Sequence, residues 1–270
     1  MNQNHQANPS KPETKIPADI KSVLDSLSTL KLPHWKQVLL SDIQNIKPAE
    51  LKLFTTYLEK WAKTEISERQ SRAIHRRIET AKFIRNQTVD QFDFKYNVST
   101  RNIEGTFLKL HRTTLEGKIP KAVLVGNTGL GKTHLARSLG YAACQANLSV
   151  SFTRAAQIVN SLATAKALHN LERELRKYRK PQLLIVDELG YVTLDTEAGN
   201  LFFQVISDRH DRGLGTIVTT NYAFGHWNQI FSSNSTALVT VERLTAEAEV
   251  FFLEGESYPQ HQKKKQKTKN

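Results

Sequence analysis

The sequence is poor in cysteine and has no long uninterrupted apolar run. Its 270 residues include one cysteine, Cys144, which excludes an intrachain disulfide framework and fits a reducing compartment. The first twenty residues are polar and lack the apolar core of a secretory signal. Residues 213–241 carry no Lys, Arg, Asp or Glu, but Asn, Ser, Thr and Gly interrupt them too often for a membrane span. We therefore expect a soluble, cytoplasmic protein without a membrane segment.

Acidic residues are scarce relative to basic ones. Asp and Glu number 26 against 38 Lys and Arg, which gives a net charge of +12 and a pI near 9.7. This excess favours nucleic acid as the partner, with an acidic membrane surface as the lesser alternative. The last twelve residues contribute five of the lysines and no acid. The remainder of the chain is therefore basic by itself.

The chain is long enough for one large domain and one small one. Its sequence predicts a flexible tail (1–18), a helical domain (19–88), an α/β domain (89–258) and a lysine-rich tail (259–270). In the helical segment, Leu51, Phe54, Leu58 and Trp61 recur at helical spacing. We expect Trp61 and the other tryptophan of this segment, Trp35, to fill its small core.

The α/β segment contains five short runs rich in Val, Ile, Leu and Phe, with helical stretches between them. The runs are 119–125, 148–153, 183–187, 216–220 and 249–253. Apolar strands that alternate with helices indicate a parallel sheet covered on both faces. The expected fold class is therefore α/β, preceded by a small all-helical domain.

The first chemical motif is a glycine-rich loop between a strand and a helix. The pattern G-x-x-x-x-G-K-[ST] is matched in full, and the residues expected to bind phosphate are Gly126, Asn127, Thr128, Gly129, Leu130, Gly131, Lys132, Thr133 and His134. Backbone amides of such a loop wrap a phosphate, and the helix N-terminus adds a favourable dipole. Lys132 would reach the β- and γ-phosphates, and the Thr133 hydroxyl would bind Mg²⁺. The alternative is an ordinary glycine-rich turn.

Two acids, Asp187 and Glu188, end the third apolar run. A carboxylate at the end of a buried strand needs a cation, and Mg²⁺ beside Asp187 would supply one. Glu188 would then orient or deprotonate an attacking water, which favours hydrolysis over transfer. Asn221 ends the next run and would contact the γ-phosphate or that water. The alternatives are a strand that exits into a polar loop, and an Asn that serves only a turn.

These motifs resemble the Walker A, Walker B and sensor-1 motifs of AAA+ ATPases. Three longer stretches resemble the IstB family of transposition helper ATPases, which are relatives of the DnaC helicase loaders. They are 131–136 (GKTHLA), 187–191 (DELGY) with 200–204 (NLFFQ), and 254–258 (EGESY). The resemblance extends over roughly residues 24–258, and 152–155 (FTRA) and 92–94 (FDF) also fit it.

The resemblance implies an ATP- and Mg²⁺-dependent protein with a defined core. Its five-stranded parallel sheet would have the order 5-1-4-3-2, and the usual C-terminal lid would be absent. Family members form homo-oligomers on duplex DNA, bend it and recruit a partner transposase. The arginine that completes a neighbouring ATP site would be Arg243, although Glu242 stands where the family has an aspartate. An ion pair of Arg243 with Glu242 or Glu247 is the alternative.

Two basic clusters are candidates for DNA contact, and each could instead be a solvated helix face. The first lies between Lys60 and Arg85 and the second follows the 155–165 helix. The residues are Arg69, Arg72, Arg76 and Arg77 in the first cluster, and Arg173, Arg176, Lys177, Arg179 and Lys180 in the second. Arg209 and Arg212, which follow the acid pair, are expected to be structural. Contacts of this kind go mostly to phosphate, so we expect non-specific duplex binding with a steep salt dependence.

The leading hypothesis is an ATPase that oligomerises on target duplex DNA, remodels it and recruits or stimulates a transposase. ATP hydrolysis would control its disassembly. The nearest alternative is a DnaC-like helicase loader that acts on single-stranded DNA. A small-molecule kinase would use the same loop, but the basic helices and the absent lid argue against it.

Overall fold

The computed structural model describes residues 18–43, 45–83 and 87–267, and it contains two compact units. The division falls between Ala73 and Ile74, inside a long helix, rather than near residue 88. Of the tail expected at residues 1–18, residues 1–17 lie outside the described residues and Ala18 begins the first helix. Arg85 of the first basic cluster and residues 268–270 also lie outside the described residues. Among the described residues, no helix combines the length and the apolarity needed to cross a bilayer.

The first unit consists of three helices. They are α1 (Ala18–Thr29), α2 (Pro33–Asp42) and the first part of α3 (Pro48–Ala81). Pro33 and Pro48 each open a helix, where their missing N–H is not needed. The core of the unit is small and aliphatic, and its buried members are Ile20, Val23, Leu24, Leu27, Leu39 and Leu58.

The two tryptophans of this unit do not fill its core. Trp35 is 58% exposed and Trp61 is 61% exposed. Helix α3 turns another face inward, because Thr55, Leu58 and Ala62 are buried at helical spacing. The expectation for both tryptophans was therefore wrong, since the smaller residues of α3 occupy the space against α1.

The second unit contains the predicted five-stranded parallel sheet. Its strands are β1 (Ala122–Gly126), β2 (Val150–Arg154), β3 (Leu183–Leu189), β4 (Gly215–Thr220) and β5 (Glu249–Leu253). They lie in the order β2-β3-β4-β1-β5, with every pair parallel. This is the expected 5-1-4-3-2 order read from the other edge, so the fold prediction is confirmed.

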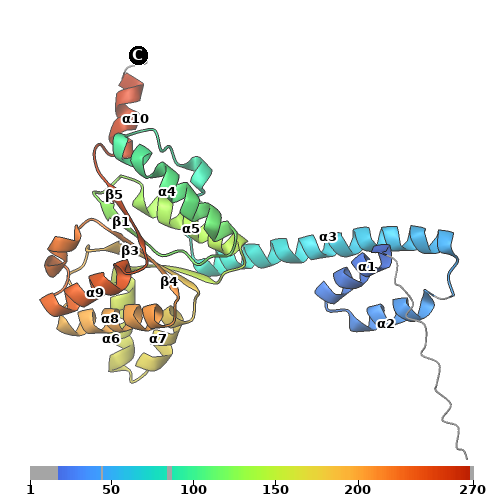
Figure 1. The fold of residues 1–270 in the computed structure, drawn as a ribbon. Helices are drawn as coiled ribbons and strands as arrows, with labels where there is room; N and C mark the ends of the chain where they lie inside the picture. The colour runs from blue at the N-terminus through green and yellow to red at the C-terminus, as the bar shows by residue number, and fades with distance from the viewer. Residues whose placement is uncertain (1–17, 44, 84–86, 268–270) are drawn as a thin grey trace, which may run out of the picture. The chain divides into compact units, whose positions relative to one another are not determined.

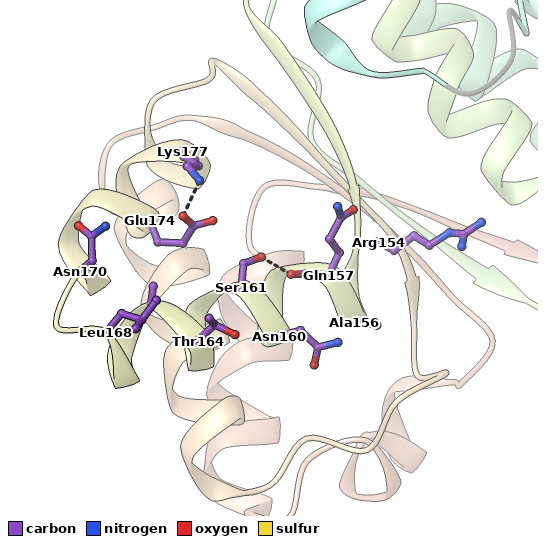
Figure 2. A pocket seen from close by; sticks show the side chains of 11 residues that line it. Arg154, Ala156, Gln157, Asn160, Ser161, Thr164, Leu168, Asn170, Glu174 and Lys177 are labelled. Carbon is purple, nitrogen blue, oxygen red and sulfur yellow. Dashed lines mark hydrogen bonds and ion pairs between the residues drawn. The ribbon is translucent and has the colours of Figure 1, made fainter.

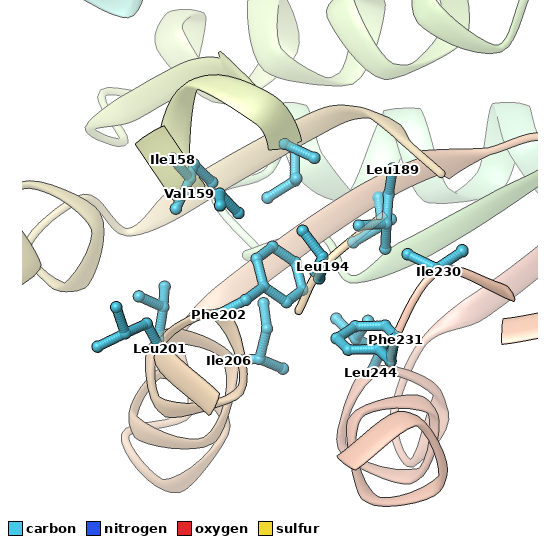
Figure 3. Packing of buried hydrophobic residues seen from close by; sticks show 14 of the residues in the cluster. Ile158, Val159, Leu189, Leu194, Leu201, Phe202, Ile206, Ile230, Phe231 and Leu244 are labelled. Carbon is cyan, nitrogen blue, oxygen red and sulfur yellow. The ribbon is translucent and has the colours of Figure 1, made fainter. Parts of the chain in front are cut away.

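Helices cover both faces of the sheet (Figure 1). The covering helices are α4 (Val98–Leu115), α5 (Lys132–Gln145), α6 (Ala155–Ala167), α7 (Leu171–Arg179), α8 (Thr196–Asp211) and α9 (Asn234–Thr245), with short 3₁₀ turns η1 (Val89–Gln91) and η2 (Phe224–Gln229). Helix α10 (Tyr258–Lys267) extends away from the sheet. Strand residues alternate between the two cores. Ala122 and Leu124 pack with α4 and α5, whereas Val123 and Val125 face the other core. Figure 3 shows part of that second core, where Phe202 of α8 lies among aliphatic side chains.

Arg209 and Cys144 are two fully buried groups of this unit. Arg209 of α8 is fully buried and donates to the carbonyl oxygens of Tyr178, Pro181, Gln182 and Gly215 and to the Thr216 hydroxyl. Its burial lowers the pKa to about 9, so the guanidinium stays charged at neutral pH. Cys144 of α5 is also fully buried, and burial raises its thiol pKa to about 12.

The segment after β5 differs from expectation. Residues 258–267 form helix α10, whereas a tail was expected from Pro259 onward. Pro259 is the second residue of this helix, a position where proline is tolerated. Among the described residues, α10 is the one helix that follows the fifth strand.

Candidate functional site

A cavity of 660 Å³ lies at the carboxyl edge of the sheet. The strands are parallel, so the loops that follow β1, β2, β3 and β4 all reach this edge. Its lining includes Gln87, Gln91, Phe92, Asp93, Tyr96, Thr128, Gly129, Gly131, Lys132, Thr133, His134, Arg137, Arg154, Glu188, Tyr191, Thr219, Thr220, Asn221, Tyr258 and Pro259. The topology thus brings together motifs that are up to about a hundred residues apart in the sequence.

The glycine loop connects β1 to α5 and forms one wall of this cavity. Gly131 caps α5 with a φ of 85°, and a Cβ at this position would collide with the ring of Phe92. The loop therefore passes closely beneath Phe92 and presents the N-terminus of α5 to the cavity. Amides and a helix dipole in this arrangement fit a bound phosphate.

Lys132 lies at the base of the loop. Its Nζ donates to the carbonyl oxygens of Gly126 at 2.6 Å and Asn127 at 2.9 Å. Burial lowers the pKa of this ammonium group, while the charges of Asp187 and Glu188 oppose that shift. The lysine is thus a partly desolvated cation beside two acids, which suits a polyanionic ligand.

Asp187 is almost completely buried and accepts two hydroxyl hydrogen bonds on the same oxygen. Thr133 Oγ1 donates to Asp187 Oδ1 at 2.8 Å, and Thr219 Oγ1 donates to it at 2.6 Å. Hydroxyl and carboxylate oxygens are the hard ligands that Mg²⁺ prefers. Thr133 and Asp187 are therefore a chemically suitable pair for the magnesium ion of a nucleotide.

Glu188 has an unusual backbone conformation. The pairing of β3 with β4 is irregular between Val186 and Leu189, and Glu188 has a φ of 61°. Such a conformation is uncommon for a residue with a side chain. The backbone N–H of Glu188 donates to Thr219 Oγ1 at 2.9 Å. Thr219 therefore supports both acids, one through a carboxylate and the other through the backbone.

The Glu188 carboxylate forms an ion pair within the cavity. Arg154 Nε, at the end of β2, lies 3.1 Å from Glu188 Oε2. Both side chains are partly exposed, so the pair is a weak one that a ligand could separate. Arg154 is also the strand partner of Asp187 in the sheet register.

Asn221 supplies an unsatisfied polar atom. Its Oδ1 is buried without a hydrogen-bond partner among the described residues, and the side chain lines the cavity. An orphaned buried acceptor is costly unless a ligand or water donates to it. Gly190 leaves room for this side chain, because a Cβ at Gly190 would lie 2.8 Å from Asn221 Oδ1.

Some of the residues expected to bind phosphate do not line the cavity. Gly126, Asn127 and Leu130 are absent from its lining, and the Leu130 side chain is buried in the core. His134 does line it, where its Nε2 lies 2.7 Å from the carbonyl oxygen of Thr88. Burial lowers the pKa of His134.

Arg243 does not reach the cavity of its own chain. It lies on α9 and its Nη1 is 3.1 Å from Asp211 Oδ1. This partner is neither of the two acids considered from the sequence, since Glu247 pairs with Lys121. Asp211 ends α8, so the ion pair joins two neighbouring helices.

Both basic clusters are partly paired with acids. On α3, Glu65 forms ion pairs with both Arg69 and Arg72. On α7, Glu172 pairs with Arg176 and Arg179, and Glu174 pairs with Lys177. The other candidates are Arg76, Arg77 and Arg173 on these helices and Lys180, which directly follows α7. Three acids thus pair with five of the nine candidates, and both clusters keep a net positive charge.

Several lining residues were not singled out as site residues from the sequence. Arg154 and Thr219 are the two most closely involved with the acid pair. Tyr191 also belongs to this group, because its hydroxyl lies 2.7 Å from that of Thr128 across the cavity mouth. Arg154 could have been found from the sheet order, which puts the end of β2 beside the acids of β3.

A second cavity, of 710 Å³, lies on the outside of the unit between α6 and α7. Figure 2 shows its mostly uncharged lining, with Lys177 bound to Glu174 at 2.5 Å. Arg154 borders both cavities, but in Figure 2 its side chain points away from the others. The guanidinium therefore belongs to the acid pair rather than to this outer groove.

Solved structures with a similar fold include two replication proteins. The DnaC helicase loader matches 63% of this chain and 97% of its own, with 22% identity and a TM-score of 0.54. AMPPCP-bound DnaA from Aquifex aeolicus matches 68% of this chain and 55% of its own, with 16% identity and a TM-score of 0.53. At these identities the likeness concerns the fold. Fold and site together define the class, a P-loop nucleotide-binding protein with the AAA+ fold.

The chain belongs to the IstB-like ATP binding protein family, whose model matches residues 25–267. It is 33% identical to the insertion sequence IS232 ATP-binding protein of Bacillus thuringiensis, over 86% of this chain and 92% of the relative. It is also 33% identical to the insertion sequence IS5376 ATP-binding protein of Geobacillus stearothermophilus, over 80% of this chain and 85% of that relative. The resemblance seen in the sequence is thus confirmed at the level of the family.

Proposed function

We propose that this protein is an ATPase that assembles on duplex DNA and serves the transposase of an insertion sequence. The observation that carries the proposal is the shared cavity of the glycine loop, the acid pair and the unsatisfied Asn221 oxygen. Its relatives are ATP-binding proteins of insertion sequences, which supports transposition as the process. We place its action in the cytoplasm, because the relatives are proteins of bacterial insertion sequences and DNA would be the shared substrate.

The cavity supplies the groups that one protomer would contribute to ATP hydrolysis. Loop amides and Lys132 bind the phosphates, while Thr133 and Asp187 would hold Mg²⁺, which neutralises charge on the β- and γ-phosphates when bound. Glu188, once released from Arg154, accepts a proton from the attacking water. The Asn221 amide orients that water or the γ-phosphate. A glutamate beside the metal ligand favours hydrolysis over transfer to a small molecule.

The test separates binding from hydrolysis. We expect Lys132→Ala to abolish nucleotide binding and nucleotide-dependent assembly on DNA. Glu188→Gln should keep ATP bound, lower turnover about 100-fold or more, and trap the assembly on duplex DNA. Glu116→Gln, which alters an exposed acid after α4, is the matched control and should behave like the parent. If Glu188→Gln disassembles as fast as the parent, Glu188 is not the hydrolytic residue.

Arg243 is proposed to act on the ATP of a neighbouring protomer. It lies on the surface and away from its own cavity, which supports a role in trans. Arg243→Ala and Glu188→Gln should each be inactive alone. A mixture of the two should regain part of the ATP turnover, because one interface type in the mixed oligomer has both residues intact. If the mixture regains no ATP turnover, Arg243 does not act on the ATP of a neighbouring protomer.

The second candidate function is helicase loading, which the structural similarity to the DnaC helicase loader favours. Duplex and single-stranded DNA affinities, each measured with ATP, separate the two functions. Preference for duplex DNA supports the transposition role, and preference for single strands supports the loader.

A further inference from the structure

The chain that follows β5 folds back onto the glycine loop. The backbone N–H of Tyr258, the first residue of α10, donates to the carbonyl oxygen of Gly129 at 3.0 Å. Ser257 Cβ and Pro259 Cδ would lie 2.9 Å and 3.7 Å from a Cβ at Gly129, which has a φ of 82°. Helix α10 therefore begins directly on the loop that would hold the nucleotide phosphates.

Tyr96 fixes this contact from the other side. Its hydroxyl donates to the carbonyl oxygen of Leu130 at 3.1 Å, inside the glycine loop. Its ring packs edge-on against Tyr258, with centroids 5.3 Å apart, and lies 6.0 Å from the ring of His261. One buried side chain thus touches both the loop and the first turn of α10.

The remainder of α10 is strongly cationic. The helix contains Lys263, Lys264, Lys265 and Lys267 and neither Asp nor Glu, while Glu254 and Glu256 precede it. The described side chains of Lys263 and Lys265 are exposed. Figure 1 shows α10 extending away from the sheet. On α3 and α7, by contrast, acids of the same helix neutralise several of the basic residues.

We propose that α10 is a contact for the phosphate backbone of duplex DNA, and that its position is coupled to the nucleotide at the glycine loop. The proposal rests on the function proposed above. A helix with several lysines and no acid complements a regular polyanion, and such contacts carry no sequence preference. Tyr258 and Pro259 line the nucleotide cavity, so a nucleotide that rearranges Gly129 and Leu130 also redirects α10.

The coupling is reciprocal by thermodynamic necessity. If ATP favours one position of α10, DNA held on α10 favours the matching conformation of the glycine loop. The carbonyl oxygen of Gly129 and the ring of Tyr96 are the points through which this coupling passes. DNA would then influence ATP affinity without touching the nucleotide.

The first experiment measures the DNA contact on the full chain. Affinity for a duplex of random sequence is measured between about 50 and 200 mM salt, with an ATP analogue present. The Lys263→Ala/Lys265→Ala variant should lower the slope of log affinity against log salt by about 2, since each phosphate contact contributes about 0.9. The Lys263→Arg/Lys265→Arg variant, which keeps the charge, should retain the slope of the parent.

The second experiment measures the coupling by amide hydrogen exchange. Duplex DNA alone should slow exchange at residues 127–131 in the parent and in the arginine variant, but not in the alanine variant. Nucleotide binding in the absence of DNA should be equal in all three, because both lysines lie outside the cavity lining. If nucleotide binding is normal and DNA does not alter loop exchange, only the coupling through α10 is wrong. If the parent does not bind nucleotide, the proposed ATP site is wrong.

Three results would overturn the inference. The first is an unchanged salt slope in the alanine variant, which would remove α10 from the DNA contact. The second is loop exchange in the parent that DNA does not alter, which would remove the coupling. The third is unchanged DNA binding with loss of binding to anionic vesicles or to a polyglutamate peptide, which would assign α10 to another acidic partner. No DNA binding by the parent would instead contradict the proposed function.

Discussion

Thr219 connects the two acids of the site although it carries no charge itself. Its hydroxyl donates to the Asp187 carboxylate and accepts from the backbone N–H of Glu188. The irregular pairing of β3 with β4 leaves that N–H without a regular ladder partner, so the hydroxyl replaces one. At the scale of the residue, the position of Glu188 thus depends on the neighbouring strand.

We predict that Thr219→Val lowers ATP turnover by about 10- to 100-fold, since a hydrogen bond to a charged group is worth about 1.5–3 kcal/mol. Thr219→Ser, which keeps the hydroxyl, should retain most of the activity. Nucleotide affinity should change by only a few fold, because Thr219 acts through Asp187 and Glu188. If Thr219 only stabilised the fold, the lower turnover of Thr219→Val would be accompanied by a matching fall in its melting temperature, so the melting temperatures are measured alongside.

Arg154 restrains the residue that is proposed to accept the proton. We predict that Arg154→Gln raises ATP turnover in the absence of DNA by up to about fivefold, because an exposed ion pair is worth at most about 1 kcal/mol. Arg154→Lys should resemble the parent, since it keeps a cation at this place. Steady-state phosphate release measures the effect. Lower turnover in Arg154→Gln would show that Arg154 assists the reaction rather than restrains Glu188.

At the scale of the elements, Arg209 joins α8 to the amino ends of β3 and β4. Its guanidinium donates to four carbonyl oxygens, which belong to Tyr178, Pro181, Gln182 and Gly215. Carbonyl oxygens thus surround the Arg209 guanidinium, and no carboxylate among the described residues forms an ion pair with it. The expectation that Arg209 is structural agrees with this position.

We predict that Arg209→Met destabilises the second unit by about 3 kcal/mol or more, because several buried carbonyls lose their donors at about 1 kcal/mol or more each. Arg209→Lys should destabilise it less, since an ammonium group can still donate. Urea unfolding followed by Trp227 fluorescence measures this in a Trp35→Phe/Trp61→Phe background, where Trp227 is the remaining tryptophan. Equal midpoints for the parent and Arg209→Met would contradict the role given to the guanidinium.

The strands and the glycine loop were predictable because local pattern determines them. Apolar runs such as 183–187 can be buried on both faces only in a covered parallel sheet. Helix α10 was not predictable in this way. Its sequence is mostly lysine and glutamine, without an apolar stripe, and its contacts with Tyr96 through Tyr258 and His261 depend on the tertiary fold. The partners of Glu188 depend on the order of the strands and on an irregularity in β3, and neither follows from spacing alone.

The whole molecule contains two units, and the first has an apolar face beyond its core. Leu53, Phe54, Tyr57 and Trp61 lie on one side of α3 and are all exposed, with the rings of Tyr57 and Trp61 6.0 Å apart. Leu51, Phe54, Leu58 and Trp61 do lie on one helix, as their spacing predicted. The spacing alone did not show which face of that helix packs against the core, since Leu58 is buried and Phe54 and Trp61 are exposed. Exposed aromatic faces of this kind are typical of interfaces.

We predict that Tyr57→Gln/Trp61→Gln lowers the oligomer formed with ATP and DNA, because large aromatic side chains contribute much of an interface's binding energy. Mass photometry measures the distribution of assemblies. ATP binding to the monomer should be unchanged, since both residues lie in the other unit. Leu168→Gln, which alters an exposed apolar residue of the second unit, is the control. An unchanged distribution would assign the α3 face to another partner.

Because Cys144 is buried, the folded protein has no accessible native thiol for labelling reagents. Its sulfur is fully buried and its pKa is raised to about 12, so maleimide reagents, which attack thiolates, leave it untouched in the folded protein. Cysteines introduced at the exposed positions Trp35 and Leu168 would then be the sole reactive thiols, one in each unit. Fluorescence energy transfer between dyes at these two positions would follow the separation of the units as ATP and DNA are added.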